Sequence, residues 1–307
     1  VYDFTGKPVD LWKTFRPFLN AAHARLNKPL VFNNVGGYGL YDTAAHADIA
    51  AVYVECWPFA GQATYNELKT VIDQAASWSG GKAVVLAAYM DYERSKAAHG
   101  RKTETFNAPG VLLTDAAIFA SGGAHIELGD GAQMLGSEYF PNRNLRLSPA
   151  LRNALRNYYD FLVGYENILR GGLQASTGSI VLNVPSSTDA TPQTVWAFAK
   201  HGDGHHVLHL INLIGENSAA WRDDQGKYPA PTVQTNIIVT YHYGPGKVKN
   251  VSWASPDARD IAPRPLPFTT GADAGGAYVR FTIPRLAYWD MATLTMAPES
   301  HSQENHP

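Results

Sequence analysis

The stretch Ala51-Val52-Tyr53-Val54-Glu55-Cys56-Trp57 decides the fold of this chain. Its first four residues predict a short buried strand, and a carboxylate and an indole follow at the carboxyl end of that strand. Polar groups directly after a buried strand are typical of parallel sheets that carry an active site along one edge. The stretch therefore predicts an α/β fold whose functional edge includes Glu55.

Three further apolar runs in the first 170 residues have the same form. They predict strands over 30–35, 83–89 and 124–128, and polar side chains occur at the carboxyl end of each. Helical patterns cover 10–26, 65–77, 115–120 and 148–169, the last opened by Ser148-Pro149 as N-cap and first helical residue. This alternation predicts a parallel sheet with right-handed crossovers.

The glycine pattern after the first strand bears on the type of sheet. Gly36-Gly37-Tyr38-Gly39 leads into Tyr41-Asp42 without a predicted helix, which argues against a nucleotide cofactor and favours a (β/α)8 TIM-type barrel. A whole barrel needs eight strands and about 250 residues. Four predicted strands therefore indicate the second half of a barrel. Three explanations stay open: the chain begins inside a larger protein, two halves assemble, or further strands exist.

From about residue 175 the pattern changes to short strands separated by turn sequences such as Gly-Asp-Gly and Gly-Pro-Gly. Such spacing is typical of an antiparallel β-sandwich. We expect three segments: the half-barrel at 1–174, the β-sandwich at 175–296, and a disordered polar tail at 297–307.

Composition excludes several classes of function. The chain has 307 residues, 45% hydrophobic and 17% charged, with a net charge of -2 and no basic run for a phosphate backbone, so nucleic acid is a poor partner. No stretch approaches the roughly 18 apolar residues of a membrane span, and residues 1–20 lack the order of a signal peptide. One cysteine, Cys56, excludes an internal disulfide. The 35 aromatic residues suit sugar binding or simply fill two cores.

Glu55 is the best candidate for catalysis. A carboxyl group at the end of a buried strand beside an aromatic ring is desolvated, which favours the protonated form that a general acid needs. Protonation of a glycosidic oxygen would suit it. A structural carboxylate in an ion pair at the rim of the sheet is the alternative.

Other polar residues after the strands are candidates for binding sugar hydroxyls, although the acidic ones also suit ordinary turns. One of the two adjacent asparagines must point away from the site, because neighbouring side chains of a strand alternate. The candidates are Asn33, Asn34, Trp57, Tyr89, Asp91, Glu127 and Asp130.

Metal and nucleophile motifs are weak by comparison. His201, His205, His206 and His209 cluster in sequence, but their strand spacing does not put them on one face, and we expect no metal site. No cofactor is predicted, and a structural calcium ion stays open. The chain also lacks the Gly-x-Ser-x-Gly elbow of serine hydrolases.

At these residues the chain resembles glycoside hydrolase family 66, the dextranases and cycloisomaltooligosaccharide glucanotransferases. The resemblance extends over nearly all of residues 1–296. The matching segments are Val31-Phe32-Asn33-Asn34-Val35, Val52-Tyr53-Val54-Glu55-Cys56-Trp57, Ala87-Ala88-Tyr89-Met90, His125-Ile126-Glu127-Leu128-Gly129-Asp130, Asn157-Tyr158-Tyr159-Asp160-Phe161-Leu162 with Glu166-Asn167, His209-Leu210-Ile211-Asn212-Leu213 and Tyr288-Trp289-Asp290.

The resemblance implies a retaining endo-hydrolase of α-1,6-linked glucan, secreted or at the cell surface of a bacterium, with dextran and isomaltooligosaccharides as partners. Glu55 matches the family's acid/base, and the seven other candidates would line the cleft. The family's Asp nucleophile would lie upstream of Val1, because neither Asp3 nor Asp10 follows a strand. The missing half of the barrel would come from the same or another chain.

The resemblance leaves alternatives open. Cyclising members typically carry a carbohydrate-binding module inserted late in the barrel, whereas only 33 residues separate Asp91 from His125, so dextranase is preferred to a cyclising transglucosylase. A non-catalytic α-glucan-binding protein and an exo-acting α-glucosidase-like enzyme of another barrel family are the other readings.

Overall fold

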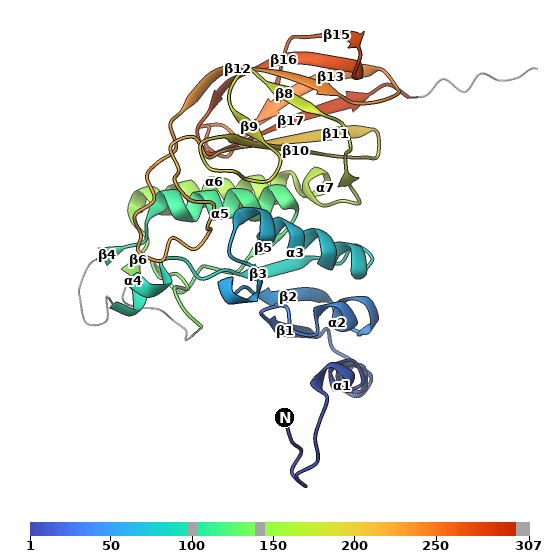
Figure 1. Cartoon of the computed structure of the whole chain (residues 1–307), viewed down its shortest axis with the longest axis vertical. Coiled ribbons are helices and arrows are strands. Elements are labelled where there is room, and N and C mark those ends of the chain that lie inside the picture. Colours follow the sequence, from blue (N-terminus) through green and yellow to red (C-terminus); the bar gives the residue numbers. More distant parts are fainter. Residues whose placement is uncertain (98–103, 139–144, 299–307) are drawn as a thin grey trace, which may run out of the picture. The chain divides into compact units, whose positions relative to one another are not determined.

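The structure of this chain is a computed structural model that describes residues 1–97, 104–138 and 145–298 (Figure 1). Contacts divide the chain into two units. The first comprises Val1–Arg156 and Ser218–Pro229, and the second comprises Asn157–Asn217 and Ala230–Pro307. Of the predicted tail at 297–307, residues 299–307 lie outside the described residues.

The first unit is built on a four-stranded parallel sheet in the order β1-β2-β3-β5. The strands follow one another across the sheet in chain order, so each crossover moves in the same direction. Their bounds are β1 Val31–Val35, β2 Ala51–Glu55, β3 Val84–Ala87 and β5 Ala124–His125, and the short strands β4 Glu104–Thr105 and β6 Leu145–Arg146 form a separate parallel pair. The four predicted strands and the mixed α/β character of this part are confirmed.

The helices of the first unit connect these strands. Asp10 caps the first helix through its side chain, and Thr64 with Glu67 forms a reciprocal capping box at the start of the helix after β2. The bounds are α1 Leu11–Leu26, α2 Leu40–His46, the 3₁₀ turn η1 Pro58–Ala60, α3 Tyr65–Trp78, α4 Tyr92–Ala97 and α5 Ala108–Ser121. A sixth helix, α6 Pro149–Gly164, crosses the division between the units.

Two predictions about the segments that follow strands of the first unit are wrong. A helix, α2, does follow the glycine pattern, because Gly39 at φ 70° is its N-cap and Leu40 begins it. The fourth strand ends at His125 instead of continuing to residue 128, because Gly129 to Gln133 close a tight turn in which the Gly129 amide donates to the Gln133 carbonyl at 2.9 Å.

The second unit consists mainly of antiparallel strands, as predicted. One sheet has the order β14-β13-β17-β11-β10-β7 with β9 paired to β10, and the other has the order β15-β16-β12-β8. The bounds are α7 Glu166–Leu169, β7 Gln174–Ala175, β8 Ile180–Leu182, β9 Ser186–Ser187, β10 Val195–Gly202, β11 His205–Asn212, β12 Gln234–His242, β13 Val248–Ala254, β14 Arg264–Pro265, β15 Phe268–Asp273, β16 Gly276–Leu286 and β17 Trp289–Met296.

Both sheets of the second unit contribute to one buried core, in which Leu208 and Leu210 of β11 pack in the same cluster as Val239 of β12 and Phe281 of β16. Two sheets facing each other over a shared apolar core have the arrangement of a sandwich. Within the described parts of the chain, no helix combines the length and apolar character needed to cross a membrane.

Candidate active site

Glu55 ends β2 at the carboxyl edge of the parallel sheet, and only 8% of its surface is exposed. Asn33 of the neighbouring strand β1 donates from Nδ2 to Glu55 Oε2 at 2.7 Å. Trp57 donates from its indole Nε1 to Glu55 Oε1 at 2.7 Å. Each carboxyl oxygen therefore has its own donor, and the two donors fix the orientation of the group that we predict to be catalytic.

Aromatic rings form a wall beside Glu55. The ring of Trp57 lies 6.0 Å from that of Tyr89 and 5.5 Å from that of Tyr92, between centroids, and stacks on Phe59 at 5.7 Å. Burial and the charge of Glu55 raise the pKa of the Tyr89 hydroxyl, so this tyrosine stays neutral. Phe59 is 83% exposed, and an exposed ring stacked on Trp57 suits a sugar face. The sequence pattern did not single out Phe59.

The two adjacent asparagines have different partners. Asn33 reaches Glu55, whereas Asn34 is buried and donates from Nδ2 to the Tyr38 carbonyl and to Thr43 Oγ1, both at 3.0 Å. The alternation of side chains along β1 accounts for this split. Only Asn33 is brought to Glu55.

Asp91 is fully buried at φ 49°, in the left-handed region, directly before α4. Its Oδ2 accepts from Arg94 Nη1 at 2.8 Å and from the Asn107 amide at 3.0 Å. Burial, and then the nearby charge of Asp223, raise the pKa of Asp91 to about 6, against the lowering effect of these donors. These contacts hold the loop after β3 together, and none of them leads to Glu55.

Glu127 and Asp130 follow β5 but differ in environment. Glu127 is 1% exposed, and its Oε2 lies 3.5 Å from His125 Nδ1. Asp130 is exposed in the tight turn, where its carbonyl accepts from the Gln133 amide at 3.1 Å. Glu127 therefore belongs to a buried cluster. Asp130 lies in a turn, which was the alternative to sugar binding for the acidic candidates.

The buried cluster joins Asp115 of α5 to His125 and Glu127 after β5. Within the part of the chain that the structure describes, it is the one group of three ligand-type side chains whose donor atoms lie within 4.8 Å of one another. His125 Nε2 lies 2.9 Å from the Ala88 carbonyl, and Nδ1 lies 2.8 Å from Asp115 Oδ1. A carbonyl only accepts, so Nε2 carries a proton, and in the neutral ring Nδ1 accepts.

Asp115 shares a hydrogen with His125 across this 2.8 Å distance, and its carboxyl group also hydrogen-bonds the side chain of Glu127. Loss of solvent raises the pKa of the Asp115 carboxyl from 3.8 to about 8. Asp115 at one end and the Ala88 carbonyl at the other hold the His125 ring between them. The sequence pattern did not single out Asp115 as a candidate site residue.

We expect Asp115 to make the unfolding free energy depend on pH. Between its ordinary pKa of 3.8 and its folded pKa of about 8, the native state binds a proton that the unfolded state releases. The unfolding free energy therefore falls as pH rises through this window, by at most about 6 kcal/mol. Asp115→Asn, which has no carboxyl group to titrate, should flatten the dependence. Urea unfolding at pH 5, 7 and 9 measures it, with exposed Asp130→Asn as the control that should keep the wild-type slope.

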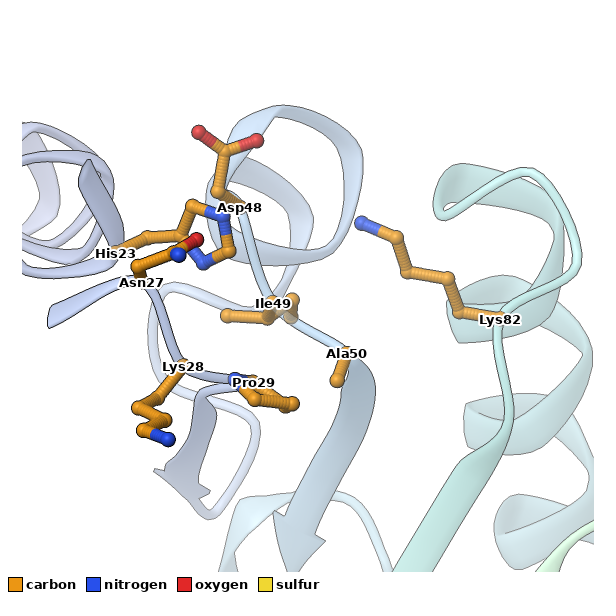
Figure 2. A pocket seen from close by; sticks show the side chains of 8 residues that line it. All are labelled: His23, Asn27, Lys28, Pro29, Asp48, Ile49, Ala50 and Lys82. Atoms are coloured by element: carbon orange, nitrogen blue, oxygen red, sulfur yellow. The ribbon is translucent and has the colours of Figure 1, made fainter.

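A separate pocket of about 420 Å³ lies at the opposite edge of the sheet (Figure 2). Figure 2 shows Pro29, Ala50 and Lys82 lining it, and these residues precede β1, β2 and β3 respectively. Its other lining residues are His23, Asn27, Lys28, Asp48 and Ile49. It contains none of the candidate residues, and parallel α/β folds carry their chemistry at the carboxyl edge.

Comparisons with known proteins identify the family. Cycloisomaltooligosaccharide glucanotransferase of Niallia circulans is 29% identical over 426 residues, covering 95% of this chain and 43% of the relative. Dextranase of Streptococcus salivarius is 31% identical over 263 residues, covering 74% of this chain and 32% of the relative. The chain thus spans less than half the length of these relatives.

A crystal structure has a closely similar fold. It is that of a Paenibacillus sp. cycloisomaltooligosaccharide glucanotransferase complexed with cycloisomaltoheptaose, with a TM-score of 0.86 and 26% identity over 95% of this chain and 60% of that chain. The model of glycosyl hydrolase family 66 matches residues 1–293. The chain therefore belongs to glycosyl hydrolase family 66.

Proposed function

We propose that this chain carries the acid/base side of an enzyme that hydrolyses internal α-1,6 linkages of dextran, with Glu55 as the acid/base. The observation that carries the proposal is the pair of 2.7 Å hydrogen bonds from Asn33 and Trp57 that orient Glu55 at the carboxyl edge of β2. The names of two relatives, a dextranase and a cycloisomaltooligosaccharide glucanotransferase, support the substrate class.

The nucleophile in this proposal is an Asp on a strand that precedes Val1. The four parallel strands lie in chain order across the sheet, β1-β2-β3-β5, as consecutive strands of a barrel do. A doubly wound sheet reverses its order at a switch point, and the four strands of this sheet show no such reversal. We assign them as the fifth to eighth strands of a (β/α)8 barrel, with Glu55 at the end of the sixth.

The chemistry would proceed in two steps. Protonated Glu55 gives its proton to the glycosidic oxygen while the Asp carboxylate attacks the anomeric carbon, so the leaving chain departs as an alcohol. Glu55, now a carboxylate, then takes a proton from a water molecule that displaces the Asp. Two displacements at one carbon retain its configuration, and the two carboxyl groups would stand about 5 Å apart.

Hydrolysis is preferred to cyclisation because of a difference in length. The match to the glucanotransferase runs over 426 residues, so the relative has at least 119 residues within the matched region that this 307-residue chain lacks. The match to the dextranase, 263 residues for 74% of the chain, has a much smaller excess. An inserted module that helps to return the end of a glucan to the active site would account for the difference. Since dextran is a polymer, we further propose that the enzyme is secreted or held at the cell surface.

Product analysis tests the proposal on the complete polypeptide that contains this chain. Incubation with long dextran should release isomaltooligosaccharides of several sizes early, and proton NMR should show the α-anomer first. Early glucose alone would indicate an exo-enzyme, and cyclic products would indicate a transglucosylase. Affinity for isomaltooligosaccharides without any new reducing ends would indicate a binding protein. Each of these three results would replace the proposal.

A further inference from the structure

A segment of chain between two strands of the second unit belongs, by its contacts, to the first unit. We call this segment, Ser218–Pro229, the strap. The Tyr65 amide donates to the Ala219 carbonyl at 3.0 Å, and the Asp91 amide donates to the Arg222 carbonyl at 3.1 Å. The strap is therefore bonded through its backbone to the segments that follow β2 and β3, where the candidate site lies.

Side chains of the strap also contact the first unit. Asp223 accepts from Asn107 Nδ2 at 2.7 Å, and its Oδ2 would lie 2.8 Å from a Cβ at Gly110, so only glycine fits there. This packing also fixes the position of Arg222, the residue directly before Asp223.

Arg222 is buried, with 8% of its surface exposed. Its guanidinium carbon lies 4.1 Å from the ring centroid of Tyr92 and 4.9 Å from that of Trp57. Guanidinium groups stack on aromatic faces at this distance, and the attraction grows when the pair is desolvated. Trp57 is the same residue whose Nε1 donates to Glu55.

The hydrogen bonding of Arg222 does not explain why a charge is buried here. Among the described residues, Nε and Nη2 are buried and make no hydrogen bond, and the nearest carboxylate oxygen, Asp224 Oδ1, lies 3.7 Å from Nε. Burial lowers the pKa of the guanidinium, although it stays charged. A buried cation with two unbonded N–H groups costs stability, so an apolar side chain would serve the packing better.

We propose that Arg222 is a positioning residue: by stacking on Trp57 it holds the indole in the orientation that aims Nε1–H at Glu55. This inference rests on the proposed function, since it assigns Arg222 to the protonation step of the same site. The planar guanidinium lies against the rings of both Trp57 and Tyr92, so it can prevent the indole from turning. Without it, Glu55 loses one of its two fixed donors.

The test compares two substrates in the complete polypeptide that contains this chain. Dextran has a leaving group that must be protonated, whereas the fluoride of α-isomaltosyl fluoride leaves without a proton. Arg222→Met should lower kcat/KM on dextran about tenfold, mainly through kcat, and change kcat/KM on the fluoride less than about threefold. Arg222→Lys, which keeps the cation, should recover part of the loss. Lys227→Met removes an exposed cation of the same strap and should match the wild type.

A double variant separates this proposal from the one on which it rests. If Arg222 acts through Glu55, Arg222→Met should cost nothing further on dextran in the Glu55→Gln background. Equal losses on both substrates, or a rise in KM alone, would overturn the positioning role. If Glu55→Gln itself shows no selective loss on dextran, the proposed function fails. If it does and Arg222→Met does not, only the role of Arg222 fails.

Discussion

Glu55→Gln in the complete polypeptide that contains this chain is expected to lose about 10²–10⁴-fold in kcat/KM on dextran, the range typical of a general acid. The carboxamide cannot donate a proton to the glycosidic oxygen, and an alkoxide leaves poorly. On α-isomaltosyl fluoride the loss in kcat/KM should be less than about tenfold, because fluoride needs no proton and kcat/KM reports the steps up to its departure.

The fold should survive this change because glutamine has nearly the same shape. One of its two terminal atoms still accepts from Asn33 or Trp57, while the other donor loses its acceptor, at a cost of about 1–3 kcal/mol. Circular dichroism and urea unfolding check the fold. Glu93→Gln, an exposed carboxylate on α4, is the matched control and should keep full activity. Near-wild-type turnover of dextran by Glu55→Gln would remove Glu55 from the mechanism.

The parallel strands could be predicted because they are short runs with apolar residues on both faces. The run at 51–54 includes all but the last residue of the strand Ala51–Glu55, and the run at 83–89 contains the strand Val84–Ala87. The pattern could not set the end of β5, since Ile126 and Leu128 are apolar yet 40% and 46% exposed. Hydrophobicity reports the tendency to be buried, and a turn can override it.

Helix α5 shows the opposite failure. The sequence predicts a helix only over 115–120, but the helix runs from Ala108 to Ser121. Twelve of its 14 residues are buried, so it has no polar stripe to give a period of 3.6 residues. Its buried Asp115 is polar in sequence and becomes interpretable only when the fold places His125 beside it.

The candidate site could be predicted only in part, for a similar reason. Glu55 and Trp57 lie two residues apart, and Asn33 lies in the neighbouring strand, so strand periodicity suffices to group them. Arg222 lies far along the chain, after β11, and no local motif marks it. Its role depends on where the strap packs, which is a tertiary contact that propensity and periodicity do not encode.

Trp221→Ala is expected to lower the unfolding free energy of the first unit by about 3–5 kcal/mol, as is typical for a buried tryptophan. Trp221 is fully buried, and its Nε1 donates to the Gln62 carbonyl at 2.5 Å. Its own carbonyl accepts from Thr114 Oγ1 at 2.9 Å. The substitution removes the ring and one hydrogen bond together, and leaves the Gln62 carbonyl without that donor.

Urea unfolding, monitored by circular dichroism, measures this loss in stability. Two further variants should give smaller losses. Trp12→Ala removes a ring that is 46% exposed and should cost less than about 1 kcal/mol. Trp221→Phe keeps most of the ring but not the N–H, so its cost should lie between the two. Brief trypsin treatment should also cut the strap after Lys227 faster in Trp221→Ala, because an undocked strap exposes its backbone.

The same variant links the strap to the candidate site. Since Trp221 precedes Arg222, an undocked strap withdraws the guanidinium from the ring of Trp57. Trp221→Ala should therefore show the selective loss on dextran predicted for Arg222→Met, at a temperature where the first unit remains folded. Unchanged stability together with slow proteolysis would mean that the strap does not depend on Trp221. Lost stability with unchanged dextran turnover would mean that the strap supports the fold of the first unit and takes no part in orienting Glu55.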